Sequence, residues 1–245
     1  MRVDPRSALT LAGVAVFCAY SIPSMHGGGG TGGLGAPPRE KLRRPVLVEV
    51  EERLKRVRTT SAGVPTLEFL RVSYAIVTIF DAIPGMGMVK SDLIGNADKI
   101  WRHQIPGEPL TLQAMCDAEI DALGGDADAA RKRDGSVCNS LLWLKRALRL
   151  IEGILIELTK HRHKPMKDCC QAAYASSLKR FHNMVMRSAF GVAVNAAPPR
   201  ANFLDTLNPG VAEAATLGTI GKLLPTISKL LDRIEGHLVE RKIER

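Results

Sequence analysis

The feature that most limits how this chain can fold is a periodic run of apolar residues near its end. Steps of three and four residues alternate through this run, which comprises Leu217, Ile220, Leu224, Ile227, Leu231, Ile234 and Leu238. Such spacing places apolar side chains on one face of an α-helix. Pro225 lies inside the run, and we expect it to kink the helix or divide it in two. Because no segment alternates with period two for long, the sequence predicts an all-α fold.

Further helices are predicted from apolar periodicity and from capping and breaking residues. We expect them at residues 46–58, 66–80, 111–123, 140–160, 168–196 and 201–208, and around Asp92. Ser91 and Thr111 are candidate N-caps, and the helix at 140–160 is expected to be the longest. Residues 124–135 are charged and bounded by glycines, so we expect a loop there.

The length and composition fit one sizeable domain with an appendage. The chain has 245 residues, of which 45% are apolar and only 4% aromatic, so we expect an aliphatic core. The formal net charge of +9 favours an anionic partner, either nucleic acid or an anionic membrane surface. No nucleic-acid module is recognisable, and the basic residues are not interleaved with aromatic ones. A solvated basic surface is the remaining interpretation of the charge.

Patterns typical of catalytic and metal sites are not apparent. The five cysteines are Cys18, Cys116, Cys138, Cys169 and Cys170. Their odd number and irregular spacing argue against a disulfide scaffold and favour reduced thiols. His161 and His163 would point to different faces of a helix, without a thiol or carboxylate cluster beside them. We also find no Ser-His-Asp, Cys-His or paired-carboxylate arrangement, so we expect no metal, no cofactor and no enzymatic activity.

Residues 1–44 differ in composition from residues 45–245, which we take as the folded domain. Arg2 and Arg6 precede an apolar run at residues 8–22, whose length suits a signal-peptide core but falls short of the ~20 residues of a comfortable membrane span. A glycine-rich linker follows. Three interpretations are open: a cleaved targeting sequence, an uncleaved anchor, or a mispredicted start of the reading frame. We expect a targeting or anchoring role.

A polar cluster is predicted on the helix that contains the sequence SDLIGNADK. Asp92, Asn96 and Lys99 lie at spacings that place them on one helical face. Their carboxylate, amide and ammonium groups suit the hydroxyls and amide of a neutral polar group. Two later segments contribute Trp143 and His182 as candidates for the same site. Taken singly, Asp92 also fits a helix-dipole role, and Trp143 and His182 also fit core positions.

Three segments carry a resemblance to a known family. In order along the chain they read DLIGNADKI, LLWLKRALRLIEGIL and LKRFHNMVMRSAFGVAVNAAP. Together they resemble the glycolipid transfer protein family over roughly residues 45–245. The resemblance implies a two-layer sandwich of about eight helices that takes lipid chains between its layers. It further implies binding and intermembrane transfer of sphingolipids, with glycosylceramides as the expected ligands.

The resemblance also assigns roles to the five candidate residues. Asp92 would accept the amide N–H of ceramide and reach the sugar, while His182 would donate to the ceramide carbonyl. Asn96 and Lys99 would hydrogen-bond the sugar hydroxyls. The ring of Trp143 would stack on the first sugar, whose C–H face is apolar. Because members that bind ceramide phosphate tend to carry basic residues at the positions of Trp143 and Asn96, these two residues favour a sugar headgroup.

Three alternatives to glycolipid transfer stay open. The first is transfer of ceramide 1-phosphate, with the phosphate held by Lys99, Lys145, Arg146 or Arg149. The second is a sphingolipid sensor without transfer activity, tethered by residues 8–22. The third is a helical interaction domain that binds no ligand.

Membrane contact is expected to differ in detail from that of the family. Family members often carry a tryptophan just after the histidine motif, whereas this chain has Asn183 and Met184 after His182. We therefore expect docking to use other apolar residues or basic charge. The resulting expectation is a monomeric, cytoplasmic protein that associates peripherally with membranes and does not bind nucleic acid.

Overall fold

The chain is helical throughout the part that the structure describes. The computed structural model describes residues 36–105, 108 and 110–245. These ranges form ten α-helices and two 3-10 helices, with two isolated β-bridges and no strand. The predicted all-α class is therefore confirmed, with more helices than the roughly eight expected. The elements are α2 (Val46–Leu54), α3 (Thr66–Ile76), η2 (Val77–Ala82), α4 (Gly87–Arg102), α5 (Leu112–Ala122), α6 (Ala127–Lys132), α7 (Val137–Lys160), α8 (Met166–Ser176), η3 (Lys179–Phe181), α9 (Met184–Val194), α10 (Arg200–Leu207) and α11 (Glu213–Glu240).

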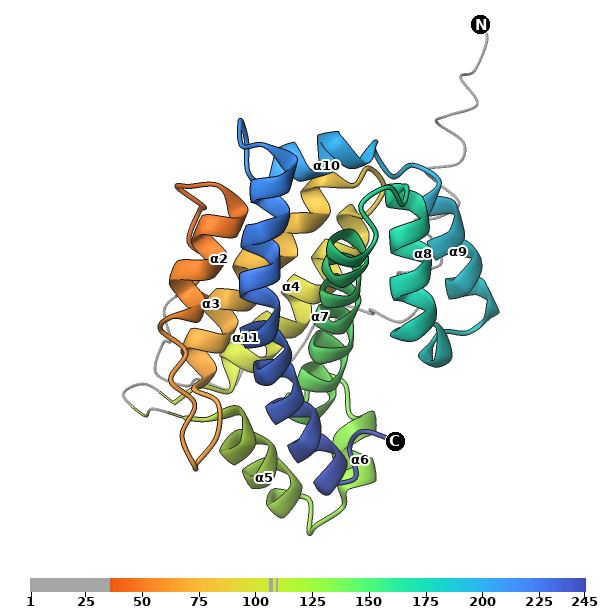
Figure 1. Ribbon diagram of the computed structural model, residues 1–245. Coiled ribbons are helices and arrows are strands. Elements are labelled where there is room, and N and C mark those ends of the chain that lie inside the picture. Colours follow the sequence, from red (N-terminus) through yellow and green to blue (C-terminus); the bar gives the residue numbers. More distant parts are fainter. Residues whose placement is uncertain (1–35, 106–107, 109) are drawn as a thin grey trace, which may run out of the picture.

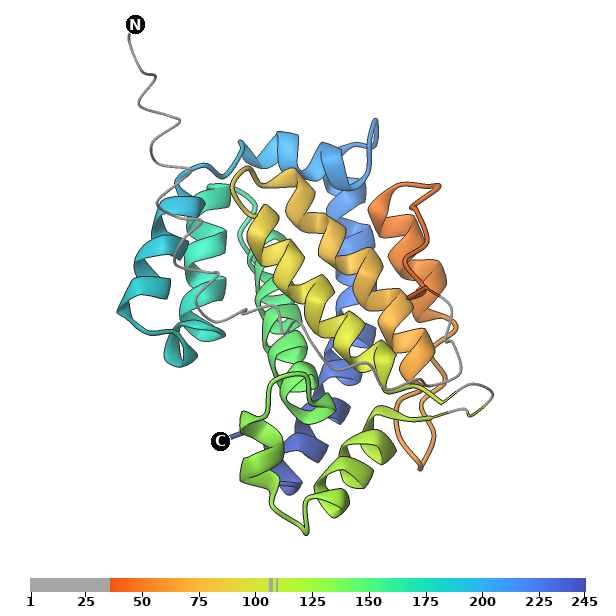
Figure 2. The same ribbon diagram turned by 180° about the vertical axis from the view of Figure 1, so that it is seen from behind.

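Helix α7 lies at the centre of the fold and contacts α4, α8 and α11. Helices α2 and α11 lie in front in Figure 1, and α3 and α4 form the layer behind them. Figure 2 shows that rear layer from the other side. Helices α8 and α9 extend the sandwich at the edge opposite α2, while α5 and α6 lie at one end and α10 at the other. This is the predicted two-layer arrangement.

The start of α7 is fixed by side-chain hydrogen bonds. Ser136 precedes the helix, and its Oγ accepts a hydrogen bond from the backbone N–H of Asn139 at 2.9 Å. The same hydroxyl donates to the carbonyl of Ala130 at 2.7 Å, which ties α6 to α7. Because serine at this position satisfies N–H groups that the helix leaves unpaired, the sequence determines where the central helix begins.

Helix α11 confirms the apolar pattern but not the expected length order. With 28 residues it is longer than α7, which has 24. Pro225 lies inside α11 and does not divide it. Proline removes one backbone hydrogen bond, but Leu223 and Ile227 on either side of it are buried. Burial of the apolar face stabilises the helix on both sides of the proline, so packing outweighs the local break.

The helix predicted at residues 168–196 is instead two helices with a break between them. Helix α8 ends at Ser176, and the hydroxyl of Ser177 donates to the carbonyl of Ala173 at 2.6 Å. Serine hydroxyls compete with the backbone for such carbonyls and favour helix ends. Helix α9 restarts after Asn183, whose side chain accepts from the N–H of Met186. The break places His182 in extended backbone, where no continuous helix would present it.

Other local predictions are partly wrong. Residues 124–135 contain the short helix α6, because the Asp126 carboxylate accepts from two backbone N–H groups and caps it. Ser91 is not an N-cap, since it lies inside α4 and its hydroxyl donates to the carbonyl of Gly87. Thr111 caps α5 as predicted. The first helix ends at Leu54, and the second continues after Ile76 only as a 3-10 turn.

The predicted apolar run at residues 8–22 and the glycine-rich linker lie outside the described residues. Within the ranges that are described, no helix is both long enough and apolar enough to cross a bilayer. The same ranges contain no cluster of three histidine, cysteine or acidic residues suited to a metal ion. Cysteines 116, 138, 169 and 170 are buried free thiols.

Candidate functional site

One open pocket of about 400 Å³ contains all five predicted site residues. It lies where α4, the start of α7 and the break between α8 and α9 meet. Its lining comprises Asp92, Asn96, Lys99, Lys132, Asp134, Asn139, Ser140, Trp143, Phe181, His182, Asn183 and Met186. Hydroxyl, amide, carboxylate, ammonium and aromatic groups thus converge on one space.

Helix α4 supplies the carboxylate, the amide and the ammonium group of the pocket. Asn96 donates from its Nδ2 to Oδ2 of Asp92 at 3.4 Å, which is the contact expected for side chains one helical turn apart. Lys99 donates to Oδ1 of Asp134 at 2.7 Å. That hydrogen bond holds the pKa of the Asp134 carboxyl below its ordinary value. The predicted common face of Asp92, Asn96 and Lys99 is therefore present.

Trp143 and His182 form the aromatic side of the pocket. Their ring centroids lie 6.3 Å apart with an angle of 25° between the planes. Trp143 is partly buried, so it presents part of its ring to the pocket while the rest packs against the core. A flat aromatic surface next to hydrogen-bonding groups is the arrangement that binds a sugar, whose ring has apolar C–H faces and polar edges.

The imidazole of His182 is held from behind by Tyr174 of α8. The Tyr174 hydroxyl lies 2.9 Å from Nδ1 of His182, and the Tyr174 ring stacks on Phe190 with centroids 3.8 Å apart. Burial lowers the pKa of His182, and the positive charges of Arg187 and Arg146 lower it further. The ring is therefore neutral at pH 7 and has one N–H donor and one acceptor nitrogen.

Sequence reasoning missed several lining residues. Asn139 and Ser140 precede Trp143 by four and three residues, so helical spacing alone was a sufficient signal for them. Asp134 and Lys132 come from the segment taken as a loop, and nothing local links them to α4. Their place in the pocket depends on how α6 packs against α7.

The ionised groups that line the pocket balance in charge. Asp92 and Asp134 oppose Lys99 and Lys132. Each lysine also has a carboxylate partner, Lys99 in Asp134 and Lys132 in Asp128. Such a pocket offers hydrogen bonds of both kinds without a net field, which suits an uncharged polar ligand better than an anion.

The two layers also meet along an apolar seam, which residues of α2, α3, α7 and α11 line. Only about 10 Å³ of space is left there. Helix α7 contributes Leu148, Ile151 and Leu155 to the seam, and α11 contributes Ile227 and Leu231. The aliphatic interior expected from the composition is therefore present, and it is tightly packed at this seam.

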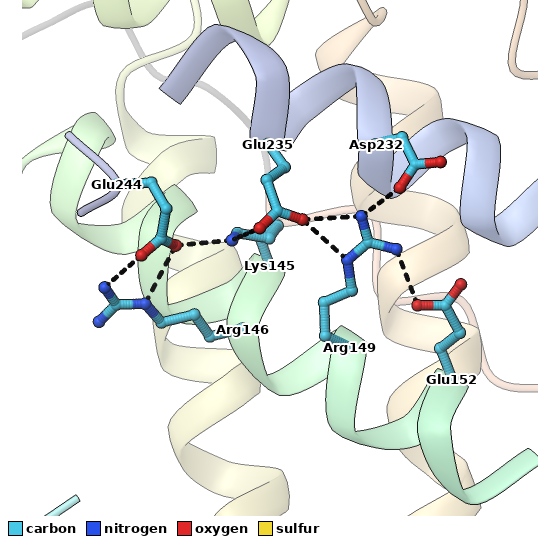
Figure 3. A network of polar contacts seen from close by, with 7 residues as sticks. All are labelled: Lys145, Arg146, Arg149, Glu152, Asp232, Glu235 and Glu244. Carbon is cyan, nitrogen blue, oxygen red and sulfur yellow. Dashed lines mark hydrogen bonds and ion pairs between the residues drawn. The ribbon is translucent and has the colours of Figure 1, made fainter. Parts of the chain in front are cut away.

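The cations named for the phosphate alternative lie elsewhere, apart from Lys99. Lys145, Arg146 and Arg149 line an adjacent hollow of about 290 Å³. All three are bound to carboxylates of α11 or of the residues after it, as Figure 3 shows. Arg149 alone reaches Glu152, Asp232 and Glu235. Their carboxylate partners neutralise these cations.

Comparison with known proteins identifies the family. Residues 64–209 match the family described as "Glycolipid transfer protein (GLTP)". The chain belongs to the glycolipid transfer protein family. Among curated relatives, the chain is 35% identical over 150 residues to the rat pleckstrin homology domain-containing family A member 8, a match that covers 60% of this chain and 28% of that protein. It is 28% identical over 160 residues to glycolipid transfer protein 1 of Arabidopsis thaliana, covering 64% of this chain and 76% of that protein.

Solved structures share the fold. A structure of FAPP2, described as selecting simple glycosphingolipids using the GLTP fold, superposes with a TM-score of 0.69 at 24% identity, covering 84% of this chain and 97% of that one. Mouse ceramide-1-phosphate transfer protein in its apo form gives a TM-score of 0.73 at 22% identity, covering 81% of this chain and 98% of that one. At these identities the likeness establishes the fold alone, and both headgroup classes occur on it.

Proposed function

We propose that the protein binds glycosphingolipids and transfers them between membranes. The observation that carries this proposal is the charge-balanced pocket in which Asp92, Asn96, Lys99, Trp143 and His182 meet, on a fold whose two layers enclose an apolar seam. The folded unit would be residues 45–245, with residues 1–44 as a targeting or anchoring segment. No bond is made or broken in this function, so the protein is not proposed to be an enzyme.

Each side chain has a physical task in headgroup binding. Asp92 accepts the amide N–H of ceramide, and the neutral ring of His182 donates to the amide carbonyl. Reading both ends of one amide selects sphingolipids over glycerolipids, whose esters lack the N–H. Asn96 and Lys99 bind sugar hydroxyls, and Trp143 supports the apolar face of the sugar.

The lipid chains make transfer slow without a protein. A chain of ~16 carbons costs about 12 kcal/mol to expose to water, at roughly 0.8 kcal/mol per methylene. Burial between the two layers removes most of this cost. Because the seam holds only about 10 Å³ of space, loading of chains between the layers would require α7 and α11 to move apart.

The surface next to the pocket suits transient contact with an anionic membrane. Met184 and Val185 at the start of α9 are 84% and 50% exposed, and Met186 beside them lines the pocket. Arg180 and Arg187 flank this apolar pair and are exposed as well. Apolar insertion with basic flanks is typical of peripheral membrane binding, and it takes the place of the tryptophan common in the family. We propose a monomeric, cytoplasmic protein that uses this surface.

A vesicle-to-vesicle transfer assay with glucosylceramide tests the proposal. Trp143→Ala and Asp92→Val should each reduce the transfer rate at least tenfold. Trp101→Ala is the matched control, because Trp101 is also partly buried against the core but does not line the pocket. If folded Trp143→Ala and Asp92→Val proteins transfer glucosylceramide at the wild-type rate, the site is wrongly assigned.

The transfer assay, combined with lipid-binding and thermal-shift measurements, also separates the alternatives. Preferred transfer of ceramide 1-phosphate would replace the sugar assignment with the phosphate one. Glycolipid binding without net transfer would indicate a sensor. Absence of bound lipid and of any thermal shift on adding lipid would leave a helical interaction domain.

A further inference from the structure

The carboxylate of Glu244 lies close to the pocket, on the far side of Arg146 from the Trp143 and Phe181 rings. The chain turns at the end of α11, where Lys242 adopts a left-handed backbone with φ of 60°. The N–H groups of Ile243 and Glu244 then both donate to the carbonyl of Leu238, at 2.8 and 2.9 Å. Ile243 is fully buried. This helix-end motif with its apolar anchor fixes the position of the Glu244 side chain.

Glu244 binds two cations of α7 (Figure 3). Its Oε2 accepts from Nζ of Lys145 at 2.6 Å, and its two oxygens accept from Nη2 and Nε of Arg146 at 2.7 and 3.2 Å. The three side chains are only 2–8% exposed. Burial alone would raise the pKa of the Glu244 carboxyl, but hydrogen bonds from Arg146 and Lys145 outweigh burial and hold the pKa below its ordinary value. Glu244 is therefore ionised at neutral pH.

Arg146 connects this ion cluster to the pocket. Its guanidinium carbon lies 3.4 Å from the ring centroid of Phe181 and 5.0 Å from that of Trp143. Both rings line the pocket. Lys145 has a second carboxylate in Glu235 at 3.3 Å. For Arg146, in contrast, Glu244 is the one salt-bridge partner found among the residues that the structure describes.

We propose that Glu244 determines headgroup selectivity by neutralising Arg146, so that the pocket accepts uncharged sugars and rejects phosphate or sulfate headgroups. The inference rests on the proposed function of the pocket. A guanidinium binds phosphate and sulfate oxygens in a two-pronged geometry when no carboxylate occupies its N–H groups. With Glu244 in place, the Nε and Nη2 edge of Arg146 is already bound to a carboxylate, and the negative charge of Glu244 repels an anion that approaches Arg146. Selectivity for a sugar headgroup then depends on two features: Trp143 supports the sugar, and Arg146 is not available to bind an anion.

Glu244→Gln tests this in the full chain. Transfer of glucosylceramide, ceramide 1-phosphate and sulfated galactosylceramide is measured separately, so that the phosphate and sulfate arms are distinguished. The ratio of anionic to neutral transfer should rise at least tenfold in one or both arms. The matched control is Glu235→Gln, which removes the same charge from the same network but contacts Lys145 and Arg149 rather than Arg146. Its ratio should stay within twofold of wild type.

Two double variants separate the proposed cause from others. Lys145→Gln/Glu244→Gln leaves the total charge of the protein unchanged and avoids an excess buried cation. Because this variant still frees Arg146, its ratio of anionic to neutral transfer should also rise tenfold. This variant also serves if Glu244→Gln alone does not fold. Arg146→Gln/Glu244→Gln removes the freed cation and should return the ratio to the wild-type value.

Calorimetric titration with inorganic phosphate gives a second readout that needs no lipid. Variants with a freed Arg146 should bind phosphate at least tenfold more tightly than wild type. An unchanged ratio together with unchanged phosphate affinity in folded variants overturns the inference, as does an equal rise in Glu235→Gln. If the wild-type protein transfers no glycolipid, the proposed function fails, while the phosphate titration still decides the role of Glu244.

Discussion

Removing the Tyr174 hydroxyl should weaken glycolipid binding without disturbing the core. The hydroxyl lies 2.9 Å from Nδ1 of His182, and the ring itself is held by stacking on Phe190. Tyr174→Phe keeps the stacked ring and deletes only the contact with the imidazole. If the hydroxyl donates to Nδ1, the neutral His182 ring carries its proton on Nε2, where it can donate to a ligand carbonyl. Tyr174 is then a positioning residue for His182.

The expected size follows from one hydrogen bond. Such a bond contributes roughly 0.5–1.5 kcal/mol net, and a loss of about 1 kcal/mol of oriented binding corresponds to about a fivefold loss of affinity. Tyr74→Phe is a close control, because Tyr74 and Tyr174 are each 6% exposed and the Tyr74 hydroxyl donates to Asp98 at 2.8 Å, away from the pocket. Tyr74→Phe should lose at least as much stability as Tyr174→Phe, because the Tyr74 hydroxyl bonds a carboxylate, but only Tyr174→Phe should lose affinity.

Two measurements decide the outcome. Glucosylceramide affinity is measured for wild type and both variants, and ¹⁵N NMR of the imidazole reports which nitrogen carries the proton. The wild-type ring should be in the Nε2–H form, and Tyr174→Phe should populate both forms. The reasoning is refuted if wild-type His182 carries its proton on Nδ1, or if Tyr74→Phe lowers affinity as much as Tyr174→Phe does.

Three further predictions concern stability. Burial lowers the pKa of His182 in the folded protein, so the unfolded chain binds more protons than the folded one below pH 6.5. The free energy of unfolding should therefore fall as the pH drops from 6.5 through the folded-state pKa of His182. Denaturant titrations at several pH values should show this slope in wild type, and His182→Gln should remove that part of it. Ser136→Ala deletes the N-cap of α7 and should cost about 1–2 kcal/mol, measured as a lower urea midpoint with unchanged m-value; an unchanged midpoint would mean that the cap is not needed. Ile151→Ala opens space in the seam and should cost about 2–5 kcal/mol, read from thermal unfolding, and a loss below 1 kcal/mol would indicate that the seam collapses freely.

Helical periodicity in the sequence was enough to predict individual helix faces. The apolar face of α11 and the shared face of Asp92, Asn96 and Lys99 follow from helical spacing, and both are present in the structure. Of the two outcomes expected at Pro225, division of the helix does not occur, because tertiary burial outweighs a local helix break. The break that places His182 was missed because the end of α8 is marked by serine hydroxyls rather than by a proline or glycine.

Ion pairs at and near the site that join residues far apart in the sequence could not be predicted from helical spacing. Asp134 neutralises Lys99 from 35 residues further along the chain, and Glu244 reaches Arg146 from 98 residues away. Ion pairs of this kind depend on how the helices pack, which no spacing within one segment reveals. For the same reason Lys145, Arg146 and Arg149 look like available cations in the sequence and are neutralised in the structure.

The closed seam between α7 and α11 has a kinetic consequence. The apolar side chains of the seam leave only about 10 Å³ of space between them, and Arg149 of α7 joins the two helices through Asp232 and Glu235. Under the proposed function, lipid uptake would begin with the rupture of these partly exposed ion pairs, which dissolved salt weakens. It would end with apolar contacts to the lipid chains, which salt does not weaken. The speed of uptake and the tightness of retention should therefore respond to ionic strength in different ways.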